Sequence, residues 1–141
     1  MILNEQSKKV IKMIKKSILI WLSMIPLAIL NGILRDIVIA PLIGMEFALP
    51  ASGITLCLLI FTGSLIFIPR LGKGKPKVYW NIGFLWVLLT IVFEFILGLS
   101  IGDTFSELLK AYDITTGNLW LIVVIFVGIA PWLVAKLKQI I

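Results

Sequence analysis

The stretch TIVFEFILGLS, residues 90 to 100, carries a single ionisable side chain, Glu94, among apolar residues. A charged group inside a membrane costs on the order of 2.5 to 3.5 kcal/mol by insertion scales, and it typically pairs with another group or serves an ion, proton or ligand. The stretch NGILRDIVIAPLIG, residues 31 to 44, offers a candidate partner in Arg35, which Asp36 follows directly. Arg35 and Glu94 are therefore the first candidates for chemistry in this chain.

Depth and helical spacing predict that these two charges lie close together. Counting about 1.5 Å per helical residue, Arg35 lies about 25 Å above the start of its stretch at Ser17/Ile18, and Glu94 lies about 22 Å above Tyr79. Small and polar residues recur on one face of each stretch at spacings of three, four or seven: Ala28, Asn31, Gly32 and Arg35 in the first, and Gly83, Val87, Thr90, Glu94 and Gly98 in the second. Such faces allow close helix contact in a membrane, so we expect the two helices to touch, with Arg35 near Glu94.

Three interpretations of Glu94 stay open. It forms a structural ion pair, it belongs to an outward-facing polar pocket for a ligand, ion or proton, or it faces lipid. An intramembrane enzyme is the weakest hypothesis, because the sequence has no histidine, no nucleophile beside a base, no metal-ligand cluster and no phosphate-binding loop. The only cysteine, Cys57, cannot form an intrachain disulfide. We expect no catalytic residue, no cofactor and no metal.

The composition requires a lipid bilayer around these residues. The chain has 141 residues, is 60% hydrophobic and has a mean hydropathy of +1.12, which is too apolar for one soluble core of this size. A membrane-spanning helix needs roughly 17 to 25 apolar residues. Four stretches meet that need, and they predict an all-α, polytopic four-helix bundle forming a single membrane domain over 1–141: about 18–34, 48–68, 79–100 and 118–135.

The distribution of basic residues predicts the orientation. Of the 13 Lys and Arg residues, all but Arg35 and Lys110 fall in the N-terminal tail, between the second and third stretches, or at the C-terminus. By the positive-inside rule, both termini are cytoplasmic in a multi-pass cell-membrane protein. The lysines can also contact anionic lipid headgroups, whereas no nucleic-acid-binding module is present. The N-terminal lysines before an apolar segment have a signal-peptide pattern, but no small-x-small site follows, so we expect a retained helix.

The two outward links carry structure of their own. In IGDTFSELLKAYDITTG, Thr104 can cap a short interfacial helix over about 105–112, with Glu107 reaching back. The first link, DIVIAPLIGMEFALP, is broken by Pro41, Gly44 and Pro50. Either the first helix extends to about Ala40, or this segment dips into the interface. On the second helix, we expect three hydroxyl groups to bond to their own backbone: those of Ser52, Thr55 and Thr62.

Several of these motifs resemble those of a group of small bacterial four-helix integral membrane proteins. The shared motifs are NGILRD, PLIG and ALPASG in the first half, and FEFILG, LLKAYD, GNLW and AP in the second. The group usually has Glu where this chain has Asp36, and Trp where it has Phe105. The resemblance covers about residues 31 to 131 and implies no particular activity. It points to a shared residue set: Asn31, Arg35, Glu94, Tyr112, Asp113 and Trp120.

The sequence therefore predicts a small membrane protein with a polar cluster near its outer side. The cluster comprises Asn31, Arg35, Asp36, Glu94, Tyr112, Asp113, Asn118 and Trp120. We expect it to be structural or accessory. The alternative is a transporter or a binder of small ligands or lipid headgroups that uses Arg35 and Glu94, with proton coupling or a homodimer left open. Small multidrug transporters do not fit, because their carboxylate lies in the first helix.

Overall fold

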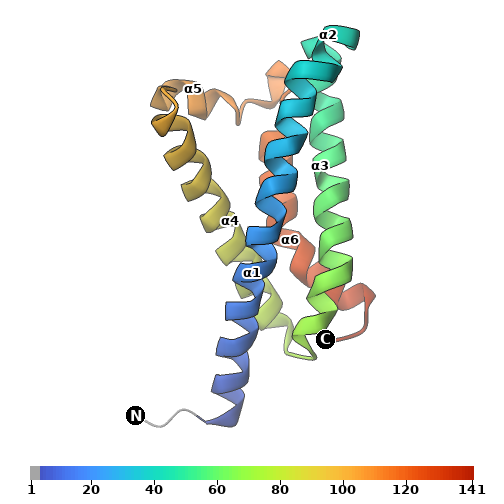
Figure 1. Cartoon of the computed structure of the whole chain (residues 1–141). Coiled ribbons are helices and arrows are strands. Elements are labelled where there is room, and N and C mark those ends of the chain that lie inside the picture. Colours follow the sequence, from blue (N-terminus) through green and yellow to red (C-terminus); the bar gives the residue numbers. More distant parts are fainter. Residues whose placement is uncertain (1–3) are drawn as a thin grey trace.

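A computed structural model, which describes residues 4–141, shows an all-α molecule with four helices long and apolar enough to span a membrane. The spans are Glu5–Ile43, Met45–Leu71, Pro76–Ser100 and Trp120–Leu137. They form a bundle in which a short segment crosses one end (Figure 1). The predicted four-span, all-α fold is confirmed.

Helix α1 (Glu5–Leu34) begins well before the predicted position 18. Asn4 caps it, since its Oδ1 accepts a hydrogen bond of 2.7 Å from the Ser7 backbone N–H. The lysine-rich tail is therefore helical rather than extended, as expected for residues of high helix propensity behind a good cap. Two residues in this region, Met13 and Ser17, are buried against the rest of the bundle.

The first span continues past α1 without a break. A π-helical turn, η1 (Arg35–Ile39), leads into α2 (Ala40–Ile43), and the Ala40 N–H donates to the carbonyl of Arg35, five residues earlier. Pro41 cannot donate to an α-helical carbonyl and would clash with one, and the wider turn relieves this conflict. The first of the two alternatives for the outer link is thus correct: the helix extends, and it reaches Ile43.

The second span begins immediately after a sharp turn at Gly44, whose φ of +86° favours glycine. Helix α3 (Met45–Phe67) starts three residues before the predicted position 48, and η2 (Ile68–Leu71) completes the span. The first and second spans are therefore antiparallel neighbours joined by a single residue.

Helices α4 (Pro76–Ser100) and α6 (Trp120–Leu137) make the most extensive contact in the bundle. Their backbones touch at Gly83 and Gly128, where a Cβ on Gly83 would lie 1.9 Å from the Gly128 carbonyl oxygen. The predicted small-residue face of the third span is present, but the prediction that the first helix packs against it was wrong for its lower part. Gly83 and Val87 face α6 rather than the first helix.

The first and third spans nevertheless touch, as predicted, at the level of two tryptophans. The Trp86 indole N–H donates to the Ser17 carbonyl at 3.1 Å, and the Trp21 indole N–H donates to Thr90 Oγ1 at 2.9 Å. The two helices diverge toward the end that carries α5 (Figure 1), and in the described chain no hydrogen bond or aromatic contact joins them beyond Phe93. Contact between them is thus confined to part of their length.

The segment between α4 and α6 contains the predicted short helix. Helix α5 (Phe105–Lys110) ends two residues before the predicted position 112, and Thr104 Oγ1 caps it by accepting from the Glu107 backbone N–H at 3.1 Å. Leu108 is buried against Gly98 of α4. A turn of 3-10 helix, η3 (Ile114–Thr116), then leads to Gly117, whose φ is +86°.

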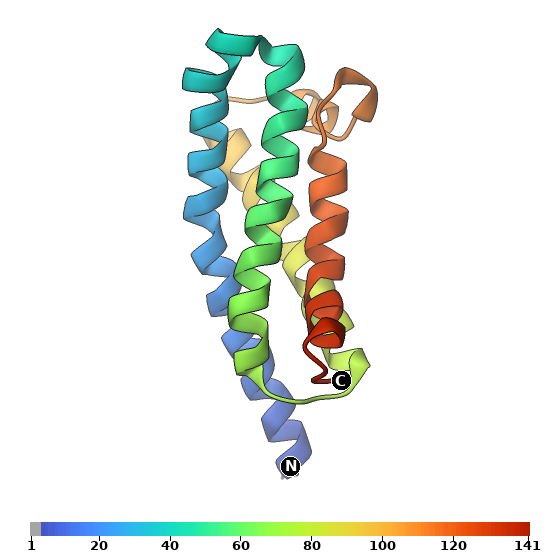
Figure 2. The same ribbon diagram turned by 90° about the vertical axis from the view of Figure 1, so that its right-hand side faces the viewer.

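The two ends of the bundle differ. The start of α1, the C-terminal residues and the loop before α4 lie at one end, here called the inner end, and α2 and α5 lie at the outer end (Figure 2). At the inner end the Gly74 N–H donates to the Ile140 carbonyl at 3.2 Å, and Trp80 stacks on Trp132 with centroids 5.0 Å apart. That the inner end is cytoplasmic stays a prediction from charge.

Candidate functional site

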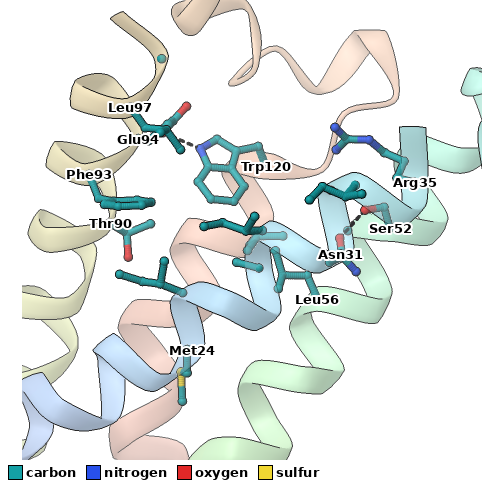
Figure 3. A pocket seen from close by; sticks show the side chains of 18 of the residues that line it. Met24, Asn31, Arg35, Ser52, Leu56, Thr90, Phe93, Glu94, Leu97 and Trp120 are labelled. Atoms are coloured by element: carbon teal, nitrogen blue, oxygen red, sulfur yellow. Dashed lines mark hydrogen bonds between the residues drawn. The ribbon is translucent and has the colours of Figure 1, made fainter. Parts of the chain in front are cut away.

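Glu94 lies on α4 near the outer end and is held by two neutral hydrogen-bond donors. Its Oε2 accepts from the Tyr112 hydroxyl at 2.5 Å and from the Trp120 indole N–H at 2.8 Å. Tyr112 follows α5 and Trp120 begins α6, so one carboxylate oxygen joins three elements of the outer end. The Trp120 bond is visible in Figure 3. A buried carboxylate needs such donors, because desolvation without them is costly.

Burial and the contact with Glu94 both change the pKa of Tyr112. Burial, followed by its hydrogen bond to Glu94, raises the pKa of the Tyr112 hydroxyl above its ordinary value. The phenol therefore stays protonated and continues to donate over the whole physiological range. Its position was predicted by the resemblance, but its role as the donor to Glu94 was not.

Arg35 does not contact Glu94. Its Nε donates to Asp36 Oδ1 at 2.8 Å, and its Nη2 donates to Asp36 Oδ2 at 3.4 Å. Within residues 4–141, neither salt bridge found joins Arg35 to Glu94. The predicted direct contact is thus absent from this structure. The adjacent carboxylate occupies the guanidinium, and α4 diverges from α1 at this level.

Arg35 and Glu94 instead line one cavity of about 510 Å³ at the outer half of the bundle. Its walls come from four helices: Ala28 and Gly32 of α1, Leu56 of α3, Phe93 of α4 and Val123 of α6 are among the lining residues. In Figure 3 the Trp120 ring lies between Glu94 on one side and Arg35 on the other. The volume falls in the range of roughly 300 to 1,000 Å³ that is common for small-molecule sites.

A second polar contact lies on the opposite wall of this cavity. The Ser52 hydroxyl of α3 donates to Asn31 Oδ1 of α1, and Figure 3 shows this bond below Arg35. The prediction that Ser52 bonds to its own backbone was wrong, whereas Thr55 and Thr62 do bond to the carbonyls four residues earlier. A helical residue's hydroxyl can serve either partner, and the sequence did not show that Asn31 faces Ser52.

The remaining predicted site residues divide into two groups. Asn118 lines the cavity, and its Oδ1 accepts from the Trp120 backbone N–H at 3.0 Å, which orients the start of α6. Asp113 is exposed and does not line the cavity. Its Oδ1 accepts from the Thr115 backbone at 3.0 Å and from the Thr115 hydroxyl at 2.6 Å, and these bonds lower the pKa of Asp113. Asp113 thus caps η3.

Besides Ser52, two further polar residues line the cavity although they were not part of the predicted polar cluster. Asp103 lines the cavity from the turn after α4, and Thr90 lines it below Glu94. Thr90 was placed on the correct helical face, but its bond to the Trp21 indole was not foreseen. A carboxylate that directly follows Gly102 in a turn has the sequence pattern of an ordinary loop residue, so the sequence did not indicate that Asp103 belongs to a site.

The cavity is apolar on the side between α1 and α4. Four apolar residues line the cavity and are also exposed on the surface of the bundle: Ile29 and Ile33 on α1, Leu97 on α4 and Ile101 directly after α4. Across the described chain, the hydrogen bonds and aromatic contacts between these two helices occur only at Thr90, Phe93 and below. Lipid-facing and cavity-facing surfaces therefore meet at this gap.

The described residues contain no group of three or more His, Cys, Asp or Glu side chains that could hold a metal ion. Within residues 4–141, the groups that could act at this site are therefore the carboxylates of Glu94 and Asp103, the two neutral donors to Glu94, the Arg35–Asp36 pair and aromatic rings.

Comparison of the chain with protein-family models, curated proteins and solved structures finds no match. The class rests on the fold alone: this is a multi-pass α-helical membrane protein with four candidate spans. The architecture is that of a small four-span membrane protein, and the similarity to the bacterial four-helix group stays a prediction from the sequence motifs.

Proposed function

We propose that this protein binds a small amphipathic molecule in its outer cavity, either as a receptor or as part of a transport cycle. The observation that carries the proposal is the 510 Å³ cavity, which combines polar groups near the outer end with an apolar wall. Ligand sites in proteins have this composition: mostly apolar linings with a few placed polar groups.

The polar groups favour binding over a purely structural role. A structural ion pair would join Arg35 directly to Glu94, but each is satisfied by another neighbour. Glu94 Oε2 accepts both donors, whereas Oε1 accepts no hydrogen bond within the described chain. That oxygen is not among the fully enclosed unpaired atoms found there, so part of its surface is exposed.

The gap between α1 and α4 supports entry from the bilayer. Its exposed apolar residues Ile29, Ile33, Leu97 and Ile101 would guide the apolar part of a ligand that is already dissolved in lipid. Because the helices touch only lower down, widening this gap would break few contacts. The cavity would therefore fill from the membrane side, with the polar end of the ligand reaching Glu94.

A structural or accessory role is the second candidate, and one observation favours it. Glu94 joins α4, the segment after α5 and the start of α6 through two hydrogen bonds. Such a junction would fix the outer end of the bundle with no ligand at all. In that case the cavity would hold only lipid, without selectivity.

A cavity-filling variant separates these two functions. An added Cβ at Gly32 meets nothing closer than 4.0 Å, so Gly32→Leu would extend into the cavity without moving the backbone. Leu30→Phe enlarges an exposed residue of the same helix that does not line the cavity, and serves as the control. The measurement is saturable thermal stabilisation of the purified protein by a panel of ten-carbon amphiphiles with cationic, zwitterionic, anionic or neutral headgroups.

We expect at least one amphiphile to stabilise the parent and Leu30→Phe but not Gly32→Leu, since ligand binding to the folded state raises its stability. If no amphiphile stabilises the parent, or if Gly32→Leu responds like the parent, the cavity is not a binding site. The structural role would then be the better description.

A further inference from the structure

We propose that the ligand of this cavity is a small amphipathic cation, a single apolar body carrying an ammonium group. This inference rests on the proposed binding function and adds the chemical class of the ligand. It follows from the charges that line the cavity, from the way each is already paired, and from the aromatic rings beside them.

The charged residues of the lining are predominantly acidic. They are one cation, Arg35, and three carboxylates, those of Asp36, Glu94 and Asp103, which gives a net charge of −2 when all are ionised. Arg35 is occupied by Asp36, so that pair is neutral as a unit. Glu94 and Asp103 are left to define the field inside the cavity, and each adds a negative charge when it is ionised.

Neither of these two carboxylates contacts a cation of the protein. Among residues 4–141, no Lys or Arg nitrogen lies within 4.0 Å of Glu94 or Asp103. The Tyr112 hydroxyl and the Trp120 indole stabilise Glu94 by hydrogen bonds, but neutral donors leave its negative charge in place. A bound cation would supply the missing opposite charge, and an anion would meet repulsion from both carboxylates.

Aromatic rings provide the second half of an ammonium site. Trp120, Trp21 and Phe93 all line the cavity. The bond from the Trp120 indole N–H to Glu94 holds that ring directly beside the carboxylate (Figure 3). Aromatic faces attract ammonium groups, and the attraction increases where water is excluded. A carboxylate beside a fixed indole thus favours an alkylated ammonium over a strongly hydrated metal cation.

The apolar part of the ligand has a defined place as well. Apolar residues such as Met24, Ile25 and Ile60 also line the cavity, and Figure 3 shows Met24 below Glu94. Single acyl or aryl groups fit a cavity of 510 Å³, and the gap between α1 and α4 leaves the rest of the molecule in contact with lipid. We therefore assign the site to a soluble amphipathic cation that partitions into the membrane, rather than to a phospholipid of the bilayer.

The experiment compares ligands that differ only in headgroup. The protein is purified in dodecyl maltoside, and thermal stabilisation and tryptophan fluorescence are titrated with decyltrimethylammonium, decanoate and decanol. We expect saturable binding of decyltrimethylammonium at least tenfold tighter than that of decanoate or decanol. Glu94→Gln should weaken cation binding at least tenfold, and Asp103→Asn should weaken it less.

Matched controls keep the result interpretable. Glu107→Gln removes a carboxylate that lies on α5 and does not line the cavity, so cation affinity should stay within twofold of the parent. If Glu94→Gln does not fold, Asp103→Asn alone must still lower cation affinity relative to Glu107→Gln. Equal affinity in those two variants would overturn the proposal.

The remaining outcomes separate this inference from the proposed function. Tighter binding of decanoate or decanol, still lost in Gly32→Leu, would overturn the cationic ligand while leaving a binding cavity. Absence of saturable binding by every probe would overturn both. If phosphatidylethanolamine added to the micelles displaces decyltrimethylammonium completely at equal concentration, the assignment to a soluble cation is wrong, and the ammonium group belongs to a lipid.

Discussion

At the scale of single residues, Glu94 shows how a half-buried carboxylate can be satisfied without a counter-cation. Two neutral donors, Tyr112 and Trp120, converge on its Oε2. Hydrogen bonds to charged groups contribute about 1.5 to 3 kcal/mol each, more than bonds between neutral groups. These two hydrogen bonds therefore hold α4, the segment after α5 and the start of α6 together at the outer end of the bundle. The second carboxylate oxygen, Oε1, is left for other partners.

Removing the indole donor tests this reasoning. Trp120→Phe keeps an aromatic ring but loses the bond to Glu94, and we expect the free energy of unfolding in detergent to fall by about 1 to 3 kcal/mol. The control is Trp132→Phe, because the Trp132 indole makes no side-chain hydrogen bond within residues 4–141. An equal loss of unfolding free energy in the two variants would show that packing of the ring, rather than the bond to Glu94, stabilises the fold at Trp120.

The Tyr112 hydroxyl gives a prediction for alkaline pH. Its pKa in the folded protein lies above the unfolded value of about 10, through burial and then the bond to Glu94. As the pH rises past 10, the unfolded chain loses this proton first, so stability should be constant below that pH and fall above it.

Tyrosinate absorbance measures this directly, with the Tyr112 signal taken as the difference between the parent and Tyr112→Phe. We expect Tyr112 to titrate above pH 10 in the folded protein and closer to 10 in Glu94→Gln, where the charge that opposes ionisation is gone. Titration of Tyr112 at its ordinary pKa in the folded parent would contradict the hydrogen bond to Glu94.

The sequence predicted the members of the site better than it predicted the contacts between them. A lone carboxylate in an apolar run marked Glu94, and six of the eight predicted residues line the cavity. The predicted contact between Arg35 and Glu94 is absent from the structure, because equal depth along two helices says nothing about the distance between their axes. Asp36, one residue away, competes for the guanidinium at almost no entropic cost.

At the scale of helices, the glycine contact between α4 and α6 positions Glu94. Gly83 and Gly128 bring the two backbones together, and this fixes where Trp120 lies relative to α4. Close approach of this kind is a main source of helix association in membranes, where lipid is as apolar as the side chains.

Gly83→Ala should therefore destabilise the bundle. The new Cβ would lie 1.9 Å from the Gly128 carbonyl oxygen, so the helices must separate, at a cost of about 1 to 3 kcal/mol. Gly32→Ala is the matched control: its Cβ meets only Arg35 Nη2, at 4.0 Å, and alanine favours the helix, so stability should hold or rise. Thermal denaturation in detergent measures both, and a Gly83→Ala variant as stable as Gly32→Ala would rule out the close contact.

The sequence predicted which segments form helices. It predicted only part of where those helices end and which helices pack together. The capping of α5 by Thr104 was correct because a capping box is a local signal. The start of α1 at Glu5 was missed because charged residues were assigned to a tail, although lysine is a good helix former. The π-helical turn at Arg35 depends on the conflict created by Pro41, and hydrophobic patterns do not report such a conflict.

At the scale of the whole molecule, the four spans bring the described start of α1, the C-terminal residues and the loop before α4 to one end (Figure 2). The cavity then lies at the opposite end, beside α5. The basic residues concentrated at the inner end predict that it faces the cytoplasm, so that Glu94 and the cavity lie toward the outside. Any ligand of the site would accordingly be taken from the outer leaflet or returned to it.

Cysteine labelling tests that orientation. In a Cys57→Ala background, Ser106→Cys places an exposed thiol on α5, and Gln139→Cys places one at the C-terminal end; neither change alters a charge that sets topology. In intact cells a membrane-impermeant maleimide should label Ser106→Cys, whereas Gln139→Cys should require permeabilisation. The reverse pattern would place the cavity on the cytoplasmic side, where its carboxylates would meet ligands from inside the cell. Labelling of both thiols in intact cells would contradict the lipid bilayer as a barrier between the two ends of the bundle.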